Sequence, residues 1–392
     1  MKIGIFSETY EPFVSGVTTS IKMLKEALEN MGHDVFIVTV NLKKYRFHYD
    51  KKNKIIYIPG MKTKIYDARL TGIYSRRAFK IIKSWHLDII HSQTEFGIGV
   101  FSRIVSKKLN IPVIHTYHTL YEDYVYYVTH NHFNNFGKKV VKKFTKYFCE
   151  KKCDGLIVPT DKIKDLFINK YHIKKEINVI PTGIDTEKFK LTPKIKKEIE
   201  KLKKEYHLKK DDFIIGSVGR IATEKSFDSL IKYTKELIKE NKKVKLIIVG
   251  DGPELEHLKE LTKNLKIDKN VIFTGKVKYD LIPSLYNLFD IVVSFSTTET
   301  QGLTIIEALA SGKPVLCIND ESFQKMITSS YNGYLFKDGK EYQKLVKKIM
   351  ESSTLYHYLS NNAYQSAQEY SKETFGKRVL EVYKKAIRNS RK

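Results

Sequence analysis

The chain has 392 residues, which is too long for one ordinary hydrophobic core and indicates two or three domains. Its three cysteines give no disulfide framework, and no stretch approaches about 18 uninterrupted apolar residues, so we expect neither a disulfide-stapled scaffold nor a membrane-spanning helix. The 70 Lys and Arg against 44 Asp and Glu leave a formal charge of +26, which favours contact with a polyanion such as nucleic acid or an anionic membrane; a surface merely solvated by lysine is the alternative.

Short apolar runs alternate with helical periodicity through the first half of the chain. A strand at 2–6 is followed by a helix at 18–31, in which apolar residues recur at helical spacing until Gly32 ends it. The further strands that we expect are DVFIVTV (34–40), DIIHS (88–92), PVIHTYH (112–118), DGLIVPT (154–160) and INVIPTG (177–183). Such short, wholly apolar strands are typical of a parallel sheet covered on both faces.

The same alternation starts again in the second half, after a lysine-rich helix at 194–210. The strands expected here are DFIIGSVGR (212–220), KLIIVGDG (245–252), NVIFTG (270–275), DIVVSFS (290–296) and KPVLCI (313–318). The fold class is therefore α/β, with two Rossmann-like, doubly wound parallel-sheet domains facing a cleft. We expect these domains at 1–187 and 188–370, and a C-terminal helix within 371–392 that packs back on the first. Ligands of such sheets bind beyond the carboxyl ends of the strands.

The segment TETQGLTIIEALASGKPV (298–315) follows one of these strands and holds two carboxylates on either side of Gly302. A helix that begins after Gly302 presents the N–H groups of Leu303 and Thr304 to an anion such as a phosphate. Glu307, one turn inside the helix, suits the hydroxyls of a ribose, and Glu299 suits whatever the phosphate carries. In the alternative interpretation, Glu299 caps the helix and Glu307 faces solvent.

Two further glycine-containing turns follow strands in the second half. Arg220 and Lys225 leave the turn in GSVGRIATEK five residues apart, and two cations at a strand end suit a diphosphate, although ordinary surface cations are the alternative. The turn VGDGPE contains Gly250 but lacks the complete G-x-G-x-x-G fingerprint.

In the first half, the loop SETYEPFVSG places Gly16 at the start of a helix, where the backbone is open to a ligand. His118 follows a strand; a structural hydrogen-bonding role is the alternative to a role in the reaction. His91, His130 and His132 show no metal-ligand spacing, nor do Cys149 and Cys153, so no metal site is expected.

Taken together, SGV, HTYHT, PTGID, VGRIATEKSFDSLI, VGDGPE and TETQGLTIIEALASGKPV resemble family 4 of the retaining glycosyltransferases, which have the GT-B fold. The match is collinear along nearly the whole chain. Within the family, SETYEPFVSGVTTSI and HTYHTLYEDYVYYV look like the bacterial diacylglycerol glucosyltransferases.

The resemblance implies a role for each matching residue. It implies that Arg220 and Lys225 bind the donor diphosphate and stabilise the leaving group, and that Glu299 and His118 contact the donor sugar. These four form the expected catalytic group. The donor would also meet Gly16, Gly250, Val277, Gly302, Leu303, Thr304 and Glu307. We expect the acceptor near Tyr10, Val17, Glu95 and Tyr117.

The implied reaction moves glucose from UDP-glucose to the 3-hydroxyl of 1,2-diacylglycerol with retention of the anomeric configuration, without a metal or other cofactor. We expect a cytoplasmic enzyme, peripheral on the inner face of the membrane, whose partners are a UDP-sugar, diacylglycerol and anionic lipid. Two segments fit a membrane surface: FGKKVVKKFTKYFCEKK (136–152) and the basic, aromatic-rich 62–85; in the alternative, their apolar stripes pack on their own sheet.

Other interpretations remain open at this point. The acceptor could instead be a glucosyl-lipid, a polyprenyl-linked glycan or a soluble sugar, and the donor another hexose. A basic nucleic-acid-binding protein is the alternative from a different class, but the sequence has no RNA-recognition or helix-turn-helix signature.

Overall fold

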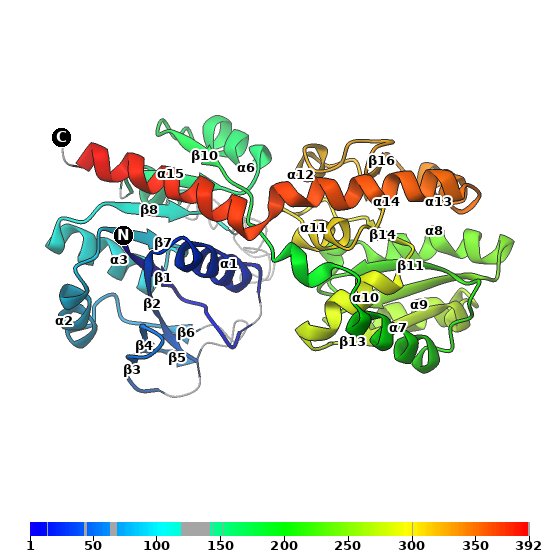
Figure 1. The fold of residues 1–392 in the computed structure, drawn as a ribbon, viewed down its shortest axis with the longest axis horizontal. Coiled ribbons are helices and arrows are strands. Elements are labelled where there is room, and N and C mark those ends of the chain that lie inside the picture. Colours follow the sequence, from blue (N-terminus) through cyan, green and yellow to red (C-terminus); the bar gives the residue numbers. More distant parts are fainter. Residues whose placement is uncertain are drawn as a thin grey trace. The chain divides into compact units, whose positions relative to one another are not determined.

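The computed structural model describes residues 1–13, 15–42, 45–62, 69–118, 142–143, 145–151, 153–299 and 301–390. The chain forms two compact units (Figure 1): unit 1 comprises Met1–Gly183 and Lys372–Lys392, and unit 2 comprises Ile184–Ser371. The chain therefore passes between the units twice. Of the membrane segment expected at 136–152, only residues 142–143 and 145–151 are described, and the part of HTYHTLYEDYVYYV after His118 lies outside the described residues.

Unit 1 is built on a mainly parallel sheet, which has eight strands among the described residues, in the order β10-β9-β8-β7-β1-β2-β4-β3. Only the pairing of β3 with β4 is antiparallel. The strands are β1 (Lys2–Ser7), β2 (Asp34–Asn41), β3 (His48–Asp50), β4 (Ile55–Pro59), β7 (Ile89–Ser92), β8 (Val113–Thr116), β9 (Gly155–Val158) and β10 (Ile177–Val179); β5 (Met61–Lys62) pairs separately with β6 (Arg69–Leu70). The helices are α1 (Gly16–Asn30), α2 (Arg76–Trp85), α3 (Gly97–Leu109), α6 (Asp161–Asp165) and α15 (Lys372–Ser390).

The last helix, α15, packs against α1 in unit 1, as Figure 1 shows for the red and dark-blue helices. Its buried residues Phe375, Val379 and Tyr383 share one apolar cluster with α1. The two helices approach closely, because a side chain at Gly376 would meet the Cβ of Ala27 at 2.6 Å. The C-terminal segment thus completes the core of unit 1.

Unit 2 has a wholly parallel sheet, six-stranded in the described part of the chain, in the order β13-β12-β11-β14-β15-β16. Its strands are β11 (Phe213–Val218), β12 (Val244–Val249), β13 (Val271–Gly275), β14 (Ile291–Ser294), β15 (Val315–Ile318) and β16 (Gly333–Phe336). Its helices are α7 (Pro193–Glu205), α8 (Phe227–Glu240), α9 (Leu255–Asn264), α10 (Ile282–Leu288), α11 (Leu303–Ala310), α12 (Glu321–Gln324), α13 (Gly339–Met350) and α14 (Ser353–Ala367).

Both faces of the second sheet are buried. Neighbouring residues of a strand point to opposite faces of the sheet, so each of them packs in a different apolar cluster. On β11, Ile214 belongs to one apolar cluster and Ile215 to the other. This burial explains the continuous apolar runs of the sequence and confirms the α/β, doubly wound expectation. Within the described ranges, no helix combines the length and the hydropathy that crossing a bilayer requires.

Candidate active site

The loops that follow β11, β12 and β14 meet at the carboxyl edge of the second sheet, since these strands lie close together in it. The N–H groups of Gly219 and Ile221 donate to Val249 O at 2.9 Å and to Asp251 O at 3.0 Å. Gly250 has φ +142°, and a side chain there would collide with the carbonyl oxygen of Gly219. The glycine in VGDGPE therefore lets the two loops pack backbone against backbone, which accounts for it without a ligand.

Lys225 and Glu299 form an ion pair between two of these loops. The Lys225 Nζ lies 2.5 Å from Glu299 Oε1, and both side chains are about one-fifth exposed, at 23% and 18%. Thr298 Oγ1 also donates to the Glu224 carbonyl at 3.3 Å. Glu299 is thus held by a cation of the β11 loop rather than acting as a helix cap, and the helix after Gly302 has no side-chain cap. Arg220 lies in the same loop as Lys225 and is partly buried.

Gly302 adopts a left-handed conformation, with φ +76° and ψ 54°, just before α11. A Cβ at this position would lie 2.7 Å from Phe323 Cε1, so glycine is required for both its torsion and its size. The first turn of α11 includes Leu303 and Thr304, whose N–H groups have no partner within the helix. The structure thus provides the helix start that the sequence predicts, with the ion pair of Glu299 in the preceding loop.

Glu307 is buried, with 8% of its surface exposed, and the alternative that it faces solvent is wrong. The Tyr286 hydroxyl lies 2.9 Å from Glu307 Oε2 and 2.8 Å from the Thr304 carbonyl oxygen, and its single hydrogen is shared between these two acceptors. Burial raises the pKa of Glu307 to about 7, an effect that the Tyr286 hydrogen bond opposes. A buried carboxyl is stabilised by polar partners such as hydroxyls, because burial deprives it of hydrogen bonds to water.

Val277 follows β13 and packs partly buried against a core cluster of unit 2. In unit 1, Gly16 begins α1 and is exposed, next to the capping side chain of Ser15, which accepts from the Thr18 N–H. Val17 is partly buried against the cluster around Tyr10, and Tyr10 itself is 4% exposed.

His118 comes just after β8, and its Nε2 lies 2.6 Å from Gln93 Oε1. Burial lowers its pKa to about 4, so the imidazole is neutral at physiological pH. Glu95 is buried and lies 3.0 Å from His115 Nε2, while Tyr117 is fully buried with its ring centroid 4.7 Å from that of Phe167. Glu95 and Tyr117 therefore both lie in the interior of unit 1.

Several polar residues at these loops were not singled out from the sequence. Tyr286 holds Glu307, Gln93 holds His118, and Ser322 Oγ donates to the Glu299 carbonyl at 2.5 Å. Glu8 accepts from the Ile98 N–H at 2.5 Å at the start of α3, and burial raises its pKa to about 7. Among the described residues, no cluster of His, Cys, Asp and Glu is arranged to hold a metal.

The comparisons with known proteins cover the chain from end to end. The model for glycosyltransferase family 4 matches residues 14–188, and that for glycosyl transferases group 1 matches residues 198–366. The chain is 39% identical to the α-monoglucosyldiacylglycerol synthase of Streptococcus pneumoniae, covering 99% of this chain and 86% of that protein. It is 35% identical to the enzyme of the same name from Acholeplasma laidlawii, covering 98% and 96%.

Among solved structures, Anabaena HepE in complex with UDP aligns with a TM-score of 0.75 at 19% identity, covering 98% of this chain and 100% of that one. Sucrose-phosphate synthase from Thermosynechococcus elongatus aligns with a TM-score of 0.74 at 18% identity, covering 98% of each. At these identities the likeness concerns the fold.

Proposed function

Since the chain belongs to family 4 of the GT-B glycosyltransferases and is a hexosyltransferase, we propose that it transfers glucose from UDP-glucose to the 3-hydroxyl of 1,2-diacylglycerol, giving α-monoglucosyldiacylglycerol. The observation that carries this choice of donor and acceptor is the similarity, along nearly the whole chain, to two α-monoglucosyldiacylglycerol synthases.

In this proposal, unit 2 binds the donor through the loops at the carboxyl edge of its sheet. Glu307 accepts the ribose hydroxyls, the first turn of α11 meets phosphate and sugar oxygens, and Val277 lies against the base. Arg220 and Lys225 bind the diphosphate. Charge develops on that diphosphate as the glycosidic bond breaks, so cations already fixed there lower the barrier most effectively. Their presence is the basis for proposing that the enzyme needs no metal.

Glu299 has two roles in the proposal. It fixes Lys225 through the 2.5 Å ion pair, and it accepts from the hydroxyls of the transferred glucose. His118 contacts the same sugar from unit 1, and its lowered pKa keeps it neutral, so it adds no charge near the reacting carbon. Retention then follows a same-face, oxocarbenium-like path without an enzymic nucleophile.

We place the acceptor and the membrane surface on unit 1. Ile73, Tyr74 and Phe96 are exposed at 57%, 41% and 45%. Their segments are neighbours, because Gly97 packs against Thr71. The adjacent helix α2 exposes the cations Arg76, Arg77, Lys80 and Lys83. Apolar side chains beside cations favour the interface of an anionic bilayer, such as the inner face of the cell membrane.

The test is to incubate the protein with radiolabelled UDP-glucose and diacylglycerol, in mixed micelles with and without phosphatidylglycerol. A labelled glycolipid that depends on diacylglycerol and increases with the anionic lipid is the expected result, unchanged by EDTA. The proposed acceptor is wrong if a soluble sugar, a glucosyl-lipid or a polyprenyl acceptor is labelled in place of diacylglycerol. The proposed donor is wrong if product forms only from another UDP-hexose.

A further inference from the structure

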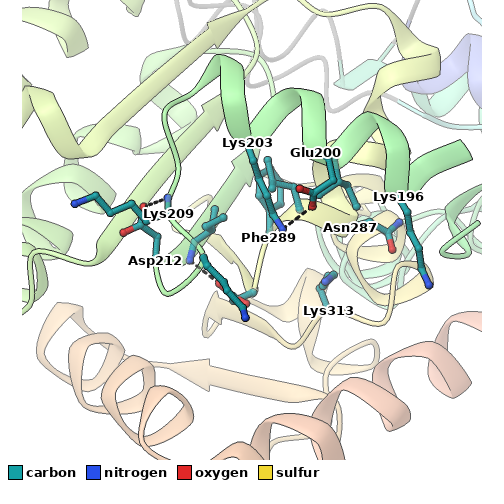
Figure 2. Close-up of a pocket in the computed structure, with 13 residues that line it drawn as sticks. Lys196, Glu200, Lys203, Lys209, Asp212, Asn287, Phe289 and Lys313 are labelled. Carbon is teal, nitrogen blue, oxygen red and sulfur yellow. Dashed lines mark hydrogen bonds and ion pairs between the residues drawn. The ribbon is translucent and has the colours of Figure 1, made fainter. Parts of the chain in front are cut away.

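Unit 2 has a concave site on the edge of its sheet opposite to the donor loops (Figure 2). The cavity has a volume of about 520 Å³ and is lined by residues that precede strands: Asp212 and Ile214 at the start of β11, Asp290 before β14, and Lys313 before β15. The donor loops follow β11, β12 and β14 instead, so a parallel sheet separates the two sites by the length of its strands.

Cations outnumber anions in the lining of this cavity. Its charged residues are five lysines, Lys196, Lys203, Lys209, Lys210 and Lys313, and three acids, Glu200, Asp212 and Asp290. The acids are partly engaged by the protein itself, because Glu200 pairs with Lys203 at 2.9 Å and Asp290 accepts from the Ile214 N–H at 2.6 Å. An excess of two positive charges therefore faces the cavity.

Lys313 distinguishes this site from an ordinary lysine-rich surface. It is partly buried, and the structure gives its ammonium no hydrogen bond or ion pair with any described residue; only the charge of Asp290 acts on it. Burial lowers its pKa to about 8, which leaves it largely protonated at neutral pH. Partial burial of an ammonium that has no bonded partner among the described residues is unfavourable, and a bound anion would reduce this cost.

The remaining walls define the shape of the ligand. Ile199, Leu288 and Phe289 add apolar surface to the lining, and Ile199 lies on the same face of α7 as Lys196 and Lys203. In Figure 2, Lys196 and Lys203 extend from α7 toward the side on which Lys313 lies. Lysine acts as a point charge toward phosphate, and several lysines around one cavity suit a dianion better than a single carboxylate.

We propose that this cavity binds a phosphate monoester or inorganic phosphate, with Lys313 as its central ligand and Lys196, Lys203 and Lys209 around it. This inference does not depend on the donor or acceptor of the enzyme, since every residue in it lies away from the donor loops.

The experiment is a titration of the purified protein with inorganic phosphate, followed by the ³¹P line width, at an ionic strength held constant with chloride. Saturable broadening is expected for the wild type. Lys313→Gln should weaken the affinity of the cavity for phosphate about tenfold, the size expected for the loss of one charged hydrogen bond. The matched control is Lys269→Gln, which removes an exposed charge of the same unit outside the cavity and should leave the binding unchanged.

Phosphate that binds at the donor loops broadens the line equally in wild type and Lys313→Gln, so the difference between the two proteins reports the cavity. If Lys313→Gln does not fold, the double variant Lys196→Gln/Lys209→Gln decides, because both side chains are exposed. No saturable binding, or binding that none of these changes weakens, overturns the proposal.

Two competitors then identify the source of the phosphate. Glycerol 3-phosphate that displaces the Lys313-dependent phosphate would point to a soluble metabolite, whereas displacement only by vesicles that contain phosphatidic acid, whose headgroup is a phosphate monoester, would point to a lipid headgroup. Failure of both to displace it would restrict the ligand to phosphate itself.

Discussion

The ammonium of Lys225 and the carboxylate of Glu299 lie 2.5 Å apart, although the two residues are 74 positions apart in the sequence. The pair joins the loop after β11 to the loop after β14, two strands that are neighbours in the sheet. A substitution of either residue therefore changes two loops of the candidate donor site.

Lys225→Ala is expected to lower turnover at least tenfold while the fold survives, because the diphosphate loses a cation and Glu299 loses its partner. Rates at saturating UDP-glucose check this. Lys232→Ala is the matched control, since Lys232 pairs with Asp228 on the exposed face of α8. Turnover like that of the wild type in folded Lys225→Ala would remove Lys225 from the catalytic group.

Tyr286→Phe is expected to raise the KM for UDP-glucose more than it lowers kcat. The change removes the hydroxyl that donates to Glu307, so the carboxyl loses its orientation and its pKa rises further above 7. Steady-state kinetics at varied UDP-glucose measure the effect, with the exposed Tyr358→Phe as control. A change in kcat alone would contradict a role of Tyr286 through the donor ribose.

Glu307→Gln should alter how stability depends on pH. The folded pKa of Glu307 is raised to about 7 from 4.5, so the neutral carboxyl stabilises the fold below about pH 4.5 and this advantage is lost as the pH rises to 7. Relative to the wild type, Glu307→Gln should therefore gain up to about 3 kcal/mol in the free energy of unfolding between pH 4.5 and 8.

Urea denaturation of both proteins at pH 5 and pH 8 tests this difference. Glu236→Gln removes an exposed carboxylate of α8 and should show no comparable change with pH. A constant difference between Glu307→Gln and wild type at the two pH values would mean that Glu307 ionises as it does in water.

Gly302→Ala should reduce both stability and activity, whereas Gly32→Ala should reduce stability alone. Both glycines have positive φ, at +76° and +79°, so both substitutions strain the backbone by about 1 kcal/mol. Only at Gly302 does the new methyl group also meet Phe323, while nothing lies within 4 Å at Gly32. Thermal unfolding of both variants measures the backbone strain. The KM for UDP-glucose measures whether the start of α11 has been displaced, which is expected only for Gly302→Ala.

Binding to vesicles should require anionic lipid and weaken as salt is added, because the cations of α2 meet the headgroups. Ile73→Asp and Phe96→Asp should weaken it further by placing a charge where an apolar side chain enters the interface. Leu191→Asp, at an equally exposed apolar residue of unit 2, is the control. Co-sedimentation gives the bound fraction, and undiminished binding to neutral vesicles at high salt would refute the electrostatic contribution.

The sequence predicts those strands that are short apolar runs ending in a loop with glycine or polar residues, as in DIVVSFS before Gly302, but it does not predict β3, β4, β5, β6 or β16. It cannot predict the contact of Lys225 with Glu299, because that contact depends on β11 and β14 being neighbours, and strand order is a property of the whole sheet. The role of Tyr286 cannot be predicted from the sequence for a related reason. Tyr286 is one of several side chains on a short apolar helix, and only the packing of α10 brings its hydroxyl to Glu307.

The alternatives for single residues also depended on the tertiary structure. Whether Glu307 faces water or the core could not be read from its spacing, since α11 is apolar on nearly all sides and six of its eight residues are buried. At Gly250 the incomplete fingerprint of the turn could not reveal that the contact with Gly219 by itself requires glycine there.

The return of α15 to unit 1 has a consequence for biosynthesis. Unit 2 is an insertion between two parts of unit 1, so the ribosome delivers all of Ile184–Ser371 before Phe375, Val379 and Tyr383 emerge. Unit 2 can thus fold during translation, whereas the apolar surface of α1 stays uncovered until about the last twenty residues have been synthesised. A premature stop near residue 371 would leave unit 2 whole and expose the face of unit 1 that α15 covers, producing a substrate for chaperones and proteases rather than half an enzyme.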